Sequence, residues 1–332
     1  MKTVSVIIPC RNEEYTIRNC VCSIANSFGV NAEYLLEILV IDGMSNDGTR
    51  KIVEEAQRDG VPVKLIDNPR VITPAALNIG IREATGDYVM IASAHSSFDQ
   101  HYISILLKEI DYLNADVVGG GMQTVVREAT PKSLAIKEVM SCPFGVGNST
   151  FRTGTDKITR VDTVPFGLYK RDTLLEAGGY DERLVRNHDM ELSKRLIAQG
   201  KKIYLIPDAR CSYYVRETYG AISKNNFGNG LWNILTVKIT KDFSSLSLRH
   251  FIPLIFLLSL ILPSLFSLLY APFVYLSLAS LLLYLAFLFA VSTKLSITKK
   301  QSFPHIFWSF IVLHFSYAAG SLSGLFKKTL QN

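Results

Sequence analysis

Short apolar runs alternate with amphipathic stretches along the first 120 residues. Five runs have the length and apolar content of buried strands: residues 4–8, 37–41, 63–66, 88–92 and 116–118. Four stretches between them place apolar residues on one helical face: residues 13–24, 49–57, 75–84 and 101–113. Strands that alternate with helices at this spacing predict a parallel sheet covered by helices on both faces. Ligands of such sheets bind at the carboxyl ends of the strands.

The middle of the chain, residues 119–215, is less regular and rich in glycine and aromatic residues. Within it, residues 189–198 predict a helix that ends at Gly200. Residues 220–241 mix large apolar side chains with three lysines, a composition typical of a helix at a membrane interface. An ordinary surface helix would have the same pattern, but the apolar segment that follows directly favours the interface.

Long apolar runs occupy the C-terminal part of the chain. Residues 251–270 and 272–291 each reach the roughly 20 residues that span a bilayer, and the Ala271–Pro272 junction predicts a tight hairpin between them. A third run, residues 303–326, contains prolines, histidines and glycines, and predicts either a third span or a segment that re-enters or lies in the interface.

The chain therefore divides into residues 1–219, which form the sheet domain, residues 220–250, which form interface helices, and residues 251–332, which form the membrane region. Because the sheet is complete before residue 250, we expect residues 1–249 to fold without the apolar tail.

Charge is distributed unevenly along the chain. Residues 250–332 lack Asp and Glu, and their five lysines account for most of the net charge of +6. A strongly basic balance would indicate nucleic acid, but this excess surrounds the apolar tail, which is the pattern of lysines at a membrane surface. We expect membrane lipids as partners and no nucleic acid.

The five cysteines are an odd number, and the N-terminus opens into a strand pattern without a secretory signal. We therefore expect reduced thiols and a cytosolic main domain in a protein of the inner cell membrane.

Polar residues follow the first two predicted strands. Pro9, Arg11 and Glu13 lie at the end of the first strand or just after it, and Asp42 follows the second, ahead of a turn rich in Gly, Ser and Asp. A carboxylate at this place can accept hydrogen bonds from a ring N–H or from sugar hydroxyls. The alternative is a turn that only caps the next helix, which suits Asp47 but not Asp42, because Asp42 comes too early.

Several sequence motifs occur in a characteristic order. Residues 6–14 read Val-Ile-Ile-Pro-Cys-Arg-Asn-Glu-Glu, and residues 41–49 read Ile-Asp-Gly-Met-Ser-Asn-Asp-Gly-Thr. Both resemble the opening motifs of family-2 glycosyltransferases with the GT-A fold, and the resemblance continues through residues 75–81, 84–88, 178–182 and 187–192. Residues 144–147 and 162–169 resemble the succinoglycan-type polysaccharide glycosyltransferases.

The resemblance covers about the first two thirds of the chain. It implies an α/β, Rossmann-like, mostly parallel sheet, followed here by an α-helical membrane region. It also implies that a nucleotide-sugar donor contacts Pro9, Arg11, Glu13, Asp42, Asn78 and Ser93.

In this family the fourth strand ends in Asp-x-Asp or Asp-x-His, which holds a divalent metal on the diphosphate. Here the motif is Ser93-Ala94-His95, so His95 matches and Ser93 lacks the carboxylate. Mg²⁺ prefers anionic oxygen ligands, whereas Mn²⁺ tolerates imidazole better. The resemblance therefore implies Mn²⁺ or Mg²⁺ held by the diphosphate and His95. The alternatives are a metal-poor site, or a His95 that hydrogen-bonds the phosphate or packs in its loop.

The family's catalytic base is the second residue of an acidic pair that opens a helix, and the pair here is His188-Asp189. The resemblance implies that Asp189 takes the proton of the acceptor hydroxyl in a single inverting displacement. Asp189 could instead cap the helix, or do both. Gly147, Arg152 and His188 are candidates to contact the acceptor or the diphosphate.

The Gln-x-x-Arg-Trp motif of the processive synthases does not occur in the sequence, which favours a single addition. We therefore expect transfer of one sugar from a nucleotide-diphosphate sugar to a polyprenyl-phosphate- or other lipid-linked acceptor, in polysaccharide or glycolipid synthesis. The alternative is a catalytically weak relative that binds a donor or a partner.

Overall fold

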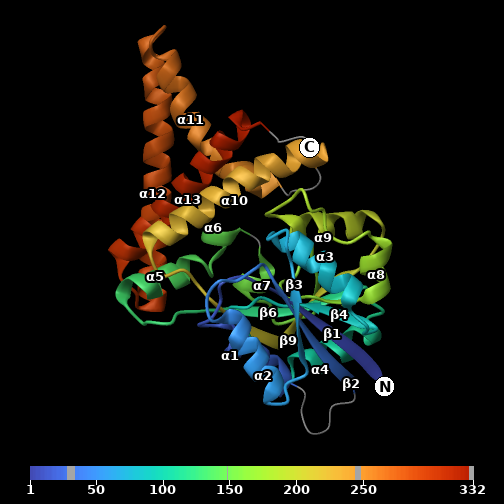
Figure 1. Ribbon diagram of the computed structural model, residues 1–332. Coiled ribbons are helices and arrows are strands. Elements are labelled where there is room, and N and C mark those ends of the chain that lie inside the picture. Colours follow the sequence, from blue (N-terminus) through green and yellow to red (C-terminus); the bar gives the residue numbers. More distant parts are fainter. Residues whose placement is uncertain (28–33, 148, 244–247, 329–332) are drawn as a thin grey trace. The chain divides into compact units, whose positions relative to one another are not determined.

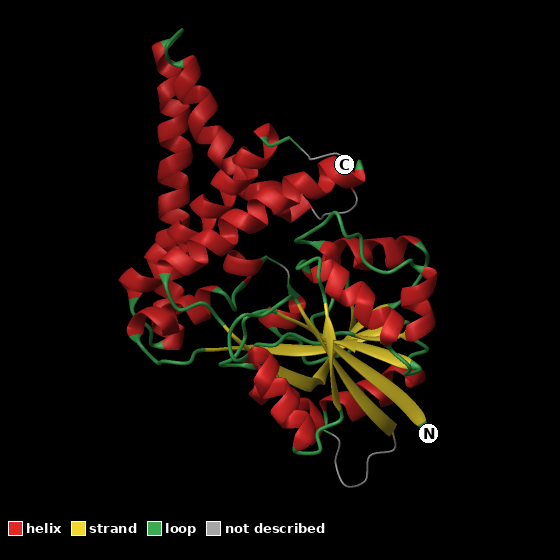
Figure 2. Ribbon diagram, viewed as in Figure 1, coloured by secondary structure: helices red, strands yellow, loops and turns green. Residues whose placement is uncertain are grey.

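The structure, a computed structural model, describes residues 1–27, 34–147, 149–243 and 248–328. It divides into two compact units, and each is described by itself. The sheet unit comprises Met1–Gln123 and Thr150–Tyr214, and the helical unit comprises Thr124–Ser149 and Val215–Asn332. Figures 1 and 2 show the strands of the first unit and the helices of the second.

A mixed sheet forms the sheet unit. Its strand order is β3-β2-β1-β4-β8-β6-β9-β5, with β7 paired to β9. The strands are β1 (Lys2–Cys10), β2 (Tyr34–Asp42), β3 (Val63–Asp67), β4 (Tyr88–Ile91), β5 (Ser96–Phe98), β6 (Val117–Val125), β7 (Thr159–Arg160), β8 (Leu168–Lys170) and β9 (Ile203–Tyr214).

The strands from β3 to β4 are parallel, as the sequence predicts. In their register Cys10 is level with Asp42, and Asp42 is level with Asp67, so the carboxyl ends of β1, β2 and β3 meet at one edge. The other half of the sheet differs from the expected parallel alternation, because β8 is antiparallel to both β4 and β6. A parallel pair needs a crossover helix on the sheet, and residues 126–149, which follow β6, belong to the helical unit instead.

Helices cover both faces of the sheet. On one face lie α1 (Ile17–Asn26), α2 (Thr49–Arg58) and α4 (Tyr102–Tyr112), and on the other lie α3 (Thr73–Glu83), α8 (Arg171–Glu176) and α9 (His188–Ala198). Side chains of β1 alternate between the faces: Val6 and Ile8 join the first core cluster, and Ile7 joins the second. Burial on both faces explains why the strands are continuous apolar runs.

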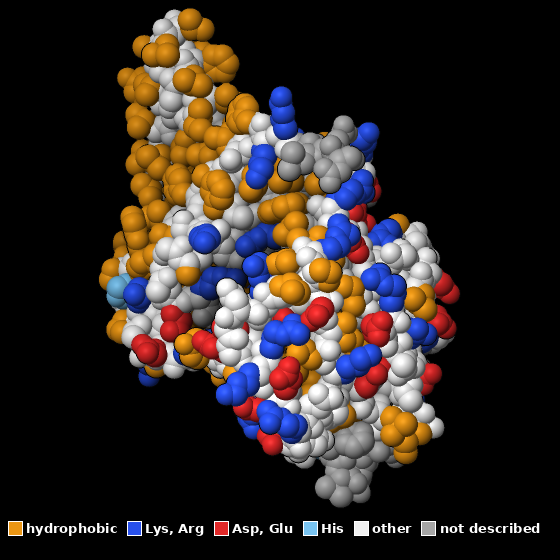
Figure 3. All heavy atoms as spheres, in the orientation of Figure 1, with side chains coloured by type: hydrophobic (Ala, Val, Ile, Leu, Met, Phe, Trp, Pro, Cys, Tyr) orange, Lys and Arg blue, Asp and Glu red, His pale blue; other side chains and the backbone are white. Residues whose placement is uncertain are grey.

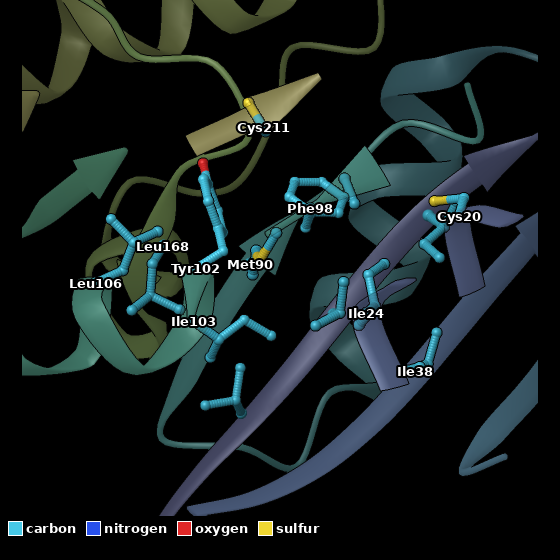
Figure 4. Packing of buried hydrophobic residues seen from close by; sticks show 14 of the residues in the cluster. Cys20, Ile24, Ile38, Met90, Phe98, Tyr102, Ile103, Leu106, Leu168 and Cys211 are labelled. Atoms are coloured by element: carbon cyan, nitrogen blue, oxygen red, sulfur yellow. The ribbon is translucent and has the colours of Figure 1, made fainter. Parts of the chain in front are cut away.

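A tyrosine anchors the core on the α1 side (Figure 4). Tyr102 is fully buried, and its hydroxyl accepts a hydrogen bond from the Gly120 amide at 3.1 Å and donates one to the Phe166 carbonyl at 3.2 Å. The hydroxyl points towards Cys211. Burial raises the pKa of the Cys211 thiol to about 12. All five cysteines are unpaired in the structure.

Most of the helical unit follows the last strand of the sheet in the sequence. Its helices are α5 (Pro131–Val139), α6 (Pro143–Val146), α10 (Tyr219–Thr240), α11 (Ile252–Phe266), α12 (Val274–Lys299) and α13 (Phe303–Phe326), with the 3-10 turns η2 (Leu248–Phe251) and η3 (Ala271–Phe273). The expected interface segment, residues 220–250, corresponds to α10 and η2, and its residues 244–247 lie outside the described residues.

Two segments are long and apolar enough to cross a membrane, Ala271–Lys299 and Phe303–Phe326, whereas α11 is shorter. Helices α11 and α12 form an antiparallel hairpin, in which Ser264 hydrogen-bonds Ser277 at 2.9 Å and Phe256 stacks on Tyr284 at 4.4 Å. Apolar side chains cover the surface of this hairpin (Figure 3), and its tip includes Leu269, which is 86% exposed. These features indicate association with a membrane.

Glycines allow α10 and α13 to pack closely. A Cβ atom on Gly320 would overlap the Phe227 carbonyl, and one on Gly230 would overlap the Tyr317 carbonyl. A Cβ atom on Gly324 would lie 2.9 Å from the Leu231 carbonyl. Gly320 and Gly324 are one helical turn apart, so the two backbones touch along a Gly-x-x-x-Gly seam, as in membrane helix pairs.

Residues 124–149 belong to the helical unit although they precede residue 219 in the sequence. In α5, Ile136 and Val139 are buried in the same cluster as Ile306 and Phe310 of α13. The helix begins at a capping threonine, because Thr130 Oγ1 accepts the Ser133 amide at 3.1 Å. This cluster also contains Val215 and Ile222, which precede residue 250, so α5 has partners on both sides of the expected boundary at residue 249.

The first prediction concerns the seam between α10 and α13. Gly320→Ala should lower the melting temperature of the detergent-solubilised protein by several degrees, because the added methyl meets backbone and overpacking costs about 1–3 kcal/mol. Gly220→Ala is the matched control: it lies in α10 with nothing within 4 Å of its Cβ position, and should be neutral or slightly stabilising. Equal melting temperatures for the two variants would contradict the close packing.

The second prediction concerns truncation. A chain that ends at residue 249 should aggregate without detergent, because the buried face of α5, with Ala135, Ile136 and Val139, loses the side chains that cover it. Replacing these three residues with serine in the truncated chain should raise the monomeric fraction in size-exclusion chromatography. A monomeric 1–249 fragment with an unchanged α5 would show that the unit boundary is misplaced.

Candidate functional site

The loops after β1 and β2 are joined by side-chain hydrogen bonds. Asn12 has a left-handed backbone (φ 54°) and its amide donates to Ser45 Oγ at 2.8 Å. The Asn46 amide donates back to Asn12 Oδ1 at 3.0 Å, and the Glu13 amide donates to Thr49 Oγ1 at 2.7 Å. The two loops therefore form one structural element, which delays the start of α1 from the expected residue 13 to Ile17.

A fully buried carboxylate supports this element. Asp42 is 0% exposed, and its Oδ2 accepts the Ser45 amide at 3.0 Å and Arg50 Nη1 at 2.7 Å. Arg50 Nη1 also lies 2.7 Å from Asp67 Oδ1, and the two carboxylates raise the pKa of Arg50. The structure thus gives Asp42 a role in ordering the loop, beside the predicted contact with a base or ribose.

The other predicted donor residues of β1 lie at the same edge. Pro9 is the penultimate residue of β1 and is partly buried, and Arg11 follows the strand with its side chain exposed. The Arg11 stem passes Gly43, since a Cβ atom on that glycine would lie 3.4 Å from Arg11 Cβ. The guanidinium is therefore beside the turn after β2, where a donor nucleotide is predicted.

The turn after β4 presents the Ser93-Ala94-His95 motif. His95 Nδ1 lies 3.4 Å from Glu13 Oε1, and His95 Nε2 lies 3.2 Å from Ser93 Oγ. The turn itself is fixed by the Ser93 carbonyl, which accepts Ser96 Oγ at 2.6 Å and Cys20 Sγ at 3.2 Å. The structure therefore brings together three predicted residues: Glu13, Ser93 and His95.

Arg152 joins this group through an aromatic side chain. It lies in α7 (Thr150–Thr153), and its guanidinium carbon is 5.3 Å from the centroid of the Tyr213 ring. The same ring packs against the edge of His95 at 5.5 Å. One wall of the site thus contains the Glu13 carboxylate, the His95 imidazole, the Tyr213 ring and the Arg152 guanidinium. A wall of this composition can face both a charged diphosphate and the sugar attached to it.

Asn78, the remaining predicted donor residue, has several partners in the chain. Its Nδ2 donates to the Tyr180 carbonyl and to Glu182 Oε1, both at 2.9 Å, and its Oδ1 accepts the Tyr180 amide at 2.8 Å. Gly179 has φ 70°, and a Cβ atom there would lie 2.5 Å from Asn78 Oδ1. These contacts indicate that Asn78 holds the 179–182 loop.

Asp189 is the second residue of α9, where the sequence places the catalytic base. Its side chain is exposed and makes no hydrogen bond or ion pair with any residue that the structure describes. Two buried phenols lie near it. Burial, with a smaller effect of the Asp189 charge, raises the pKa of Tyr169 to about 12. Burial, with smaller effects of Tyr169 and Asp189, raises the pKa of Tyr180 well above its usual value. Both phenols stay neutral and therefore provide no positive charge to the carboxylate.

The neighbouring acids differ from Asp189, because each of them is paired. Glu191 contacts Arg195 at 2.8 Å, Asp181 contacts Arg183 at 2.7 Å, and Glu182 contacts Arg70. A carboxylate in an ion pair is a weaker proton acceptor. Glu191, the alternative base in this helix, is therefore less suited to the role.

His188 lies inside the fold. Its ring meets the edge of Tyr180 at 5.6 Å, and its Nδ1 is buried with no hydrogen-bond partner among the described residues. Burial lowers the pKa of His188 below its usual 6.5, against the opposing effect of Asp189. A neutral ring at neutral pH offers a diphosphate no positive charge.

Gly147 lies in the helical unit, at the end of α6, whereas the other predicted site residues lie in the sheet unit. Its backbone (φ 63°, ψ −154°) is open to glycine and strained for other residues. Sequence reasoning did not single out Arg50 and Tyr213, which order the donor side. A signal for each was present in the sequence. Arg50 is the second residue of the helix that follows Asp42, and Tyr213 belongs to an aromatic pair at the end of a long strand.

Known families and proteins match this chain over most of its length. The model of the family described as Glycosyl transferase family 2 matches residues 5–176. Succinoglycan biosynthesis protein ExoA of Rhizobium meliloti (strain 1021) is 30% identical over 228 residues, which are 68% of this chain and 67% of that protein. A dolichyl N-acetyl-alpha-D-glucosaminyl phosphate diacetamidodideoxyglucuronosyltransferase of Methanococcus voltae is 28% identical over 252 residues, 71% of this chain and 77% of that protein.

Solved structures share the fold. Mannosyltransferase PcManGT of Pyrobaculum calidifontis, in complex with GDP-Man and Mn²⁺, has a TM-score of 0.58 and 19% identity, with 97% of this chain and 87% of that chain covered. S. aureus TarS 1-349 in complex with UDP has a TM-score of 0.51 and 17% identity, with 97% and 91% covered. The GT-A-like sheet, the order of the motifs and the sequence matches agree, and the chain belongs to glycosyl transferase family 2.

Proposed function

We propose that this chain transfers one sugar, with inversion, from a nucleotide-diphosphate sugar to a lipid-linked acceptor at the cytosolic face of the cell membrane. Its family makes it a nucleotide-sugar-dependent glycosyltransferase. The observation that carries the rest is the exposed carboxylate of Asp189, which has no partner among the described residues while the acids around it are paired.

The proposed reaction is a single displacement. The acceptor hydroxyl oxygen attacks the anomeric carbon from the face opposite the diphosphate, and the bond from that carbon to the diphosphate oxygen breaks. Asp189 takes the hydroxyl proton, and the nucleoside diphosphate leaves with the bonding electron pair. One displacement inverts the anomeric configuration.

The donor side of the proposal rests on the edge where β1, β2 and β3 end. A nucleotide could contact three features of the joined loops: exposed backbone, the Arg11 guanidinium, and the turn after β2 that Asp42 orders. The wall of Glu13, His95 and Arg152 would face the diphosphate and sugar. Structural neighbours with this fold are complexes with UDP, UDP-GlcNAc and GDP-Man, which supports a nucleotide-sugar donor.

The residues of this wall do not fit a resident metal site. Among the described residues no group of three His, Cys, Asp or Glu side chains could hold an ion, so His95 would supply one ligand to a cation that also binds the diphosphate. The proposed step therefore uses no metal held by the protein alone. The Mn²⁺ of the Pyrobaculum complex accompanies GDP-Man, and here we expect Mn²⁺ or Mg²⁺ to arrive with the diphosphate.

The acceptor side of the proposal rests on the helical unit. The Methanococcus relative is named for a dolichyl-linked acceptor, and the Rhizobium relative for succinoglycan synthesis. An apolar hairpin that enters the bilayer would keep the enzyme beside such a lipid, and Gly147 belongs to the same unit. The enzyme would then be anchored by more than one membrane helix in the inner membrane.

A catalytically weak donor-binding protein is the second candidate function. Two observations favour it: Ser93 replaces the metal-binding acid, and His188 is buried and neutral where the family has an acid. Both candidate functions include donor binding, but only the first includes efficient turnover. The effect of Asp189→Asn on turnover therefore separates them.

The third prediction concerns the base. Asp189→Asn should lower kcat about 10²–10⁴-fold, because the amide cannot take the acceptor proton. Nucleoside-diphosphate binding, measured as a rise in melting temperature with UDP or GDP, should persist. Asp172→Asn is the matched control, since Asp172 is an exposed acid at the second position of α8 and forms no ion pair with any described residue. Near-normal turnover by Asp189→Asn at saturating donor would remove Asp189 as the base.

The fourth prediction concerns the cation. EDTA should reduce transfer without abolishing it, and Mn²⁺ should restore more activity than Mg²⁺, because imidazole suits Mn²⁺ better. Ser93→Asp should lower the Mn²⁺ concentration that gives half-maximal rate, since it adds a carboxylate beside His95. Complete loss in EDTA with full recovery by Mg²⁺ alone would contradict this account.

A further inference from the structure

Helices α10 and α13 lie side by side and run in the same direction (Figure 1). At their N-terminal ends, Tyr219 Oη lies 2.9 Å from His305 Nδ1. At their C-terminal ends, Lys238 Nζ donates to the carbonyls of Gly324 at 2.9 Å and Leu325 at 2.7 Å. The glycine seam lies between these contacts, so the two helices are paired along nearly their whole length.

This pairing restricts how the chain can cross a bilayer. Two helices packed in parallel along their length occupy the same slab of the membrane. If α13 crosses, α10 crosses in the same sense. The start of α10 would then be on the same side as the start of α13, and the two C-terminal ends would share the opposite side.

The segment between the two helices is a hairpin. Besides the Ser264–Ser277 contact, Phe256 of α11 faces Tyr284 of α12, as an antiparallel pair requires. A hairpin crosses the bilayer an even number of times, so the end of α10 and the start of α13 lie on the same side. A crossing α10 would put these two points on opposite sides. The parallel pairing and the hairpin therefore agree only when neither α10 nor α13 crosses.

Charge supports the same arrangement. The helical unit contains 13 Lys and Arg against 4 Asp and Glu, whereas the sheet unit contains 22 against 25. The cations lie along α10, on α5, and at the ends of α12 and α13: Lys224, Lys238, Lys241, Lys132, Lys137, Lys294, Lys299, Lys300, Lys327 and Lys328. A crossing α13 would send the last two across the bilayer, whereas lysines beside membrane segments collect on the cytosolic side.

The contact between α10 and α13 also contains more polar groups than the interior of a bilayer favours. Asn226 and Asn233 of α10 are buried in the unit, Asn233 donates to the Tyr317 hydroxyl, and Lys238 is bonded to the end of α13. Ion pairing joins the α12 end to α5, because Lys299 lies 4.0 Å from Glu138. Charged and amide groups at this density are typical of an interface helix.

We propose that α5, α10 and α13 form a platform on the surface of an anionic membrane, and that the α11–α12 hairpin alone enters the bilayer. Apolar side chains on the outer face of α13, such as Trp308 (51% exposed) and Phe326 (81% exposed), contact the acyl chains at the boundary. The exposed lysines of the platform, Lys224, Lys327 and Lys328, contact lipid phosphates. Helix α13, although long and apolar enough to span, lies in the membrane plane, and its end at Phe326 stays on the cytosolic side.

The fifth prediction tests this arrangement with the full chain. An epitope tag at each terminus is followed by protease digestion of sealed inverted vesicles and of intact spheroplasts. Both tags should be digested in inverted vesicles and both protected in spheroplasts, because both ends lie on the cytosolic side. Membrane retention after a carbonate wash confirms that the hairpin is inserted in the same samples.

A matched control adds one unrelated membrane-spanning helix before the C-terminal tag. The tag should then change sides, which shows that the assay detects either location. Opposite protection of the two tags in the unmodified chain would overturn the platform and establish α13 as a span. Because the readout is tag location, this result is independent of whether the chain transfers sugar.

Discussion

The buried carboxylate of Asp42 is the interaction on which the donor side depends. A charge without solvent contact needs partners, and this one has the Ser45 amide and the Arg50 guanidinium. Those partners fix the turn after β2, and Ser45 in turn accepts the Asn12 amide after β1. The position of Glu13, and through it of His95, follows from this chain of contacts. One buried charge thus links the sheet edge to the wall that would face a diphosphate.

The chain passes three times between the two units. The chain leaves the sheet after Gln123, contributes α5 and α6 to the helical unit, and returns at Thr150. Gly147 and Arg152, candidates for the acceptor side and the donor side, are therefore five residues apart in sequence but belong to different units.

The sequence predicts the parallel half of the sheet well, because strands such as β1 are buried on both faces and are continuous apolar runs. It predicts the antiparallel half poorly, because short strands such as β8 depend on tertiary pairing. The glycine seam, the Asp42–Arg50 pair and the contact of Tyr213 with Arg152 are long-range or orientation-dependent, and no local periodicity encodes them. Asp189 was predicted from its motif, but only the structure shows that Glu191 is paired whereas Asp189 has no ion-pair partner among the described residues.

The central claim is that Asp189 supports a single displacement on a nucleotide-sugar donor bound at the edge of β1 and β2. The most direct measurement is the anomeric configuration of the transferred sugar, determined by NMR on product made by the full-length enzyme in detergent. The donor is the one whose nucleoside diphosphate gives the largest thermal stabilisation. The account predicts inversion, so an α-linked donor gives a β-linked product. A product that retains the donor configuration would contradict it, because retention requires a second displacement or a front-face reaction that Asp189 does not provide.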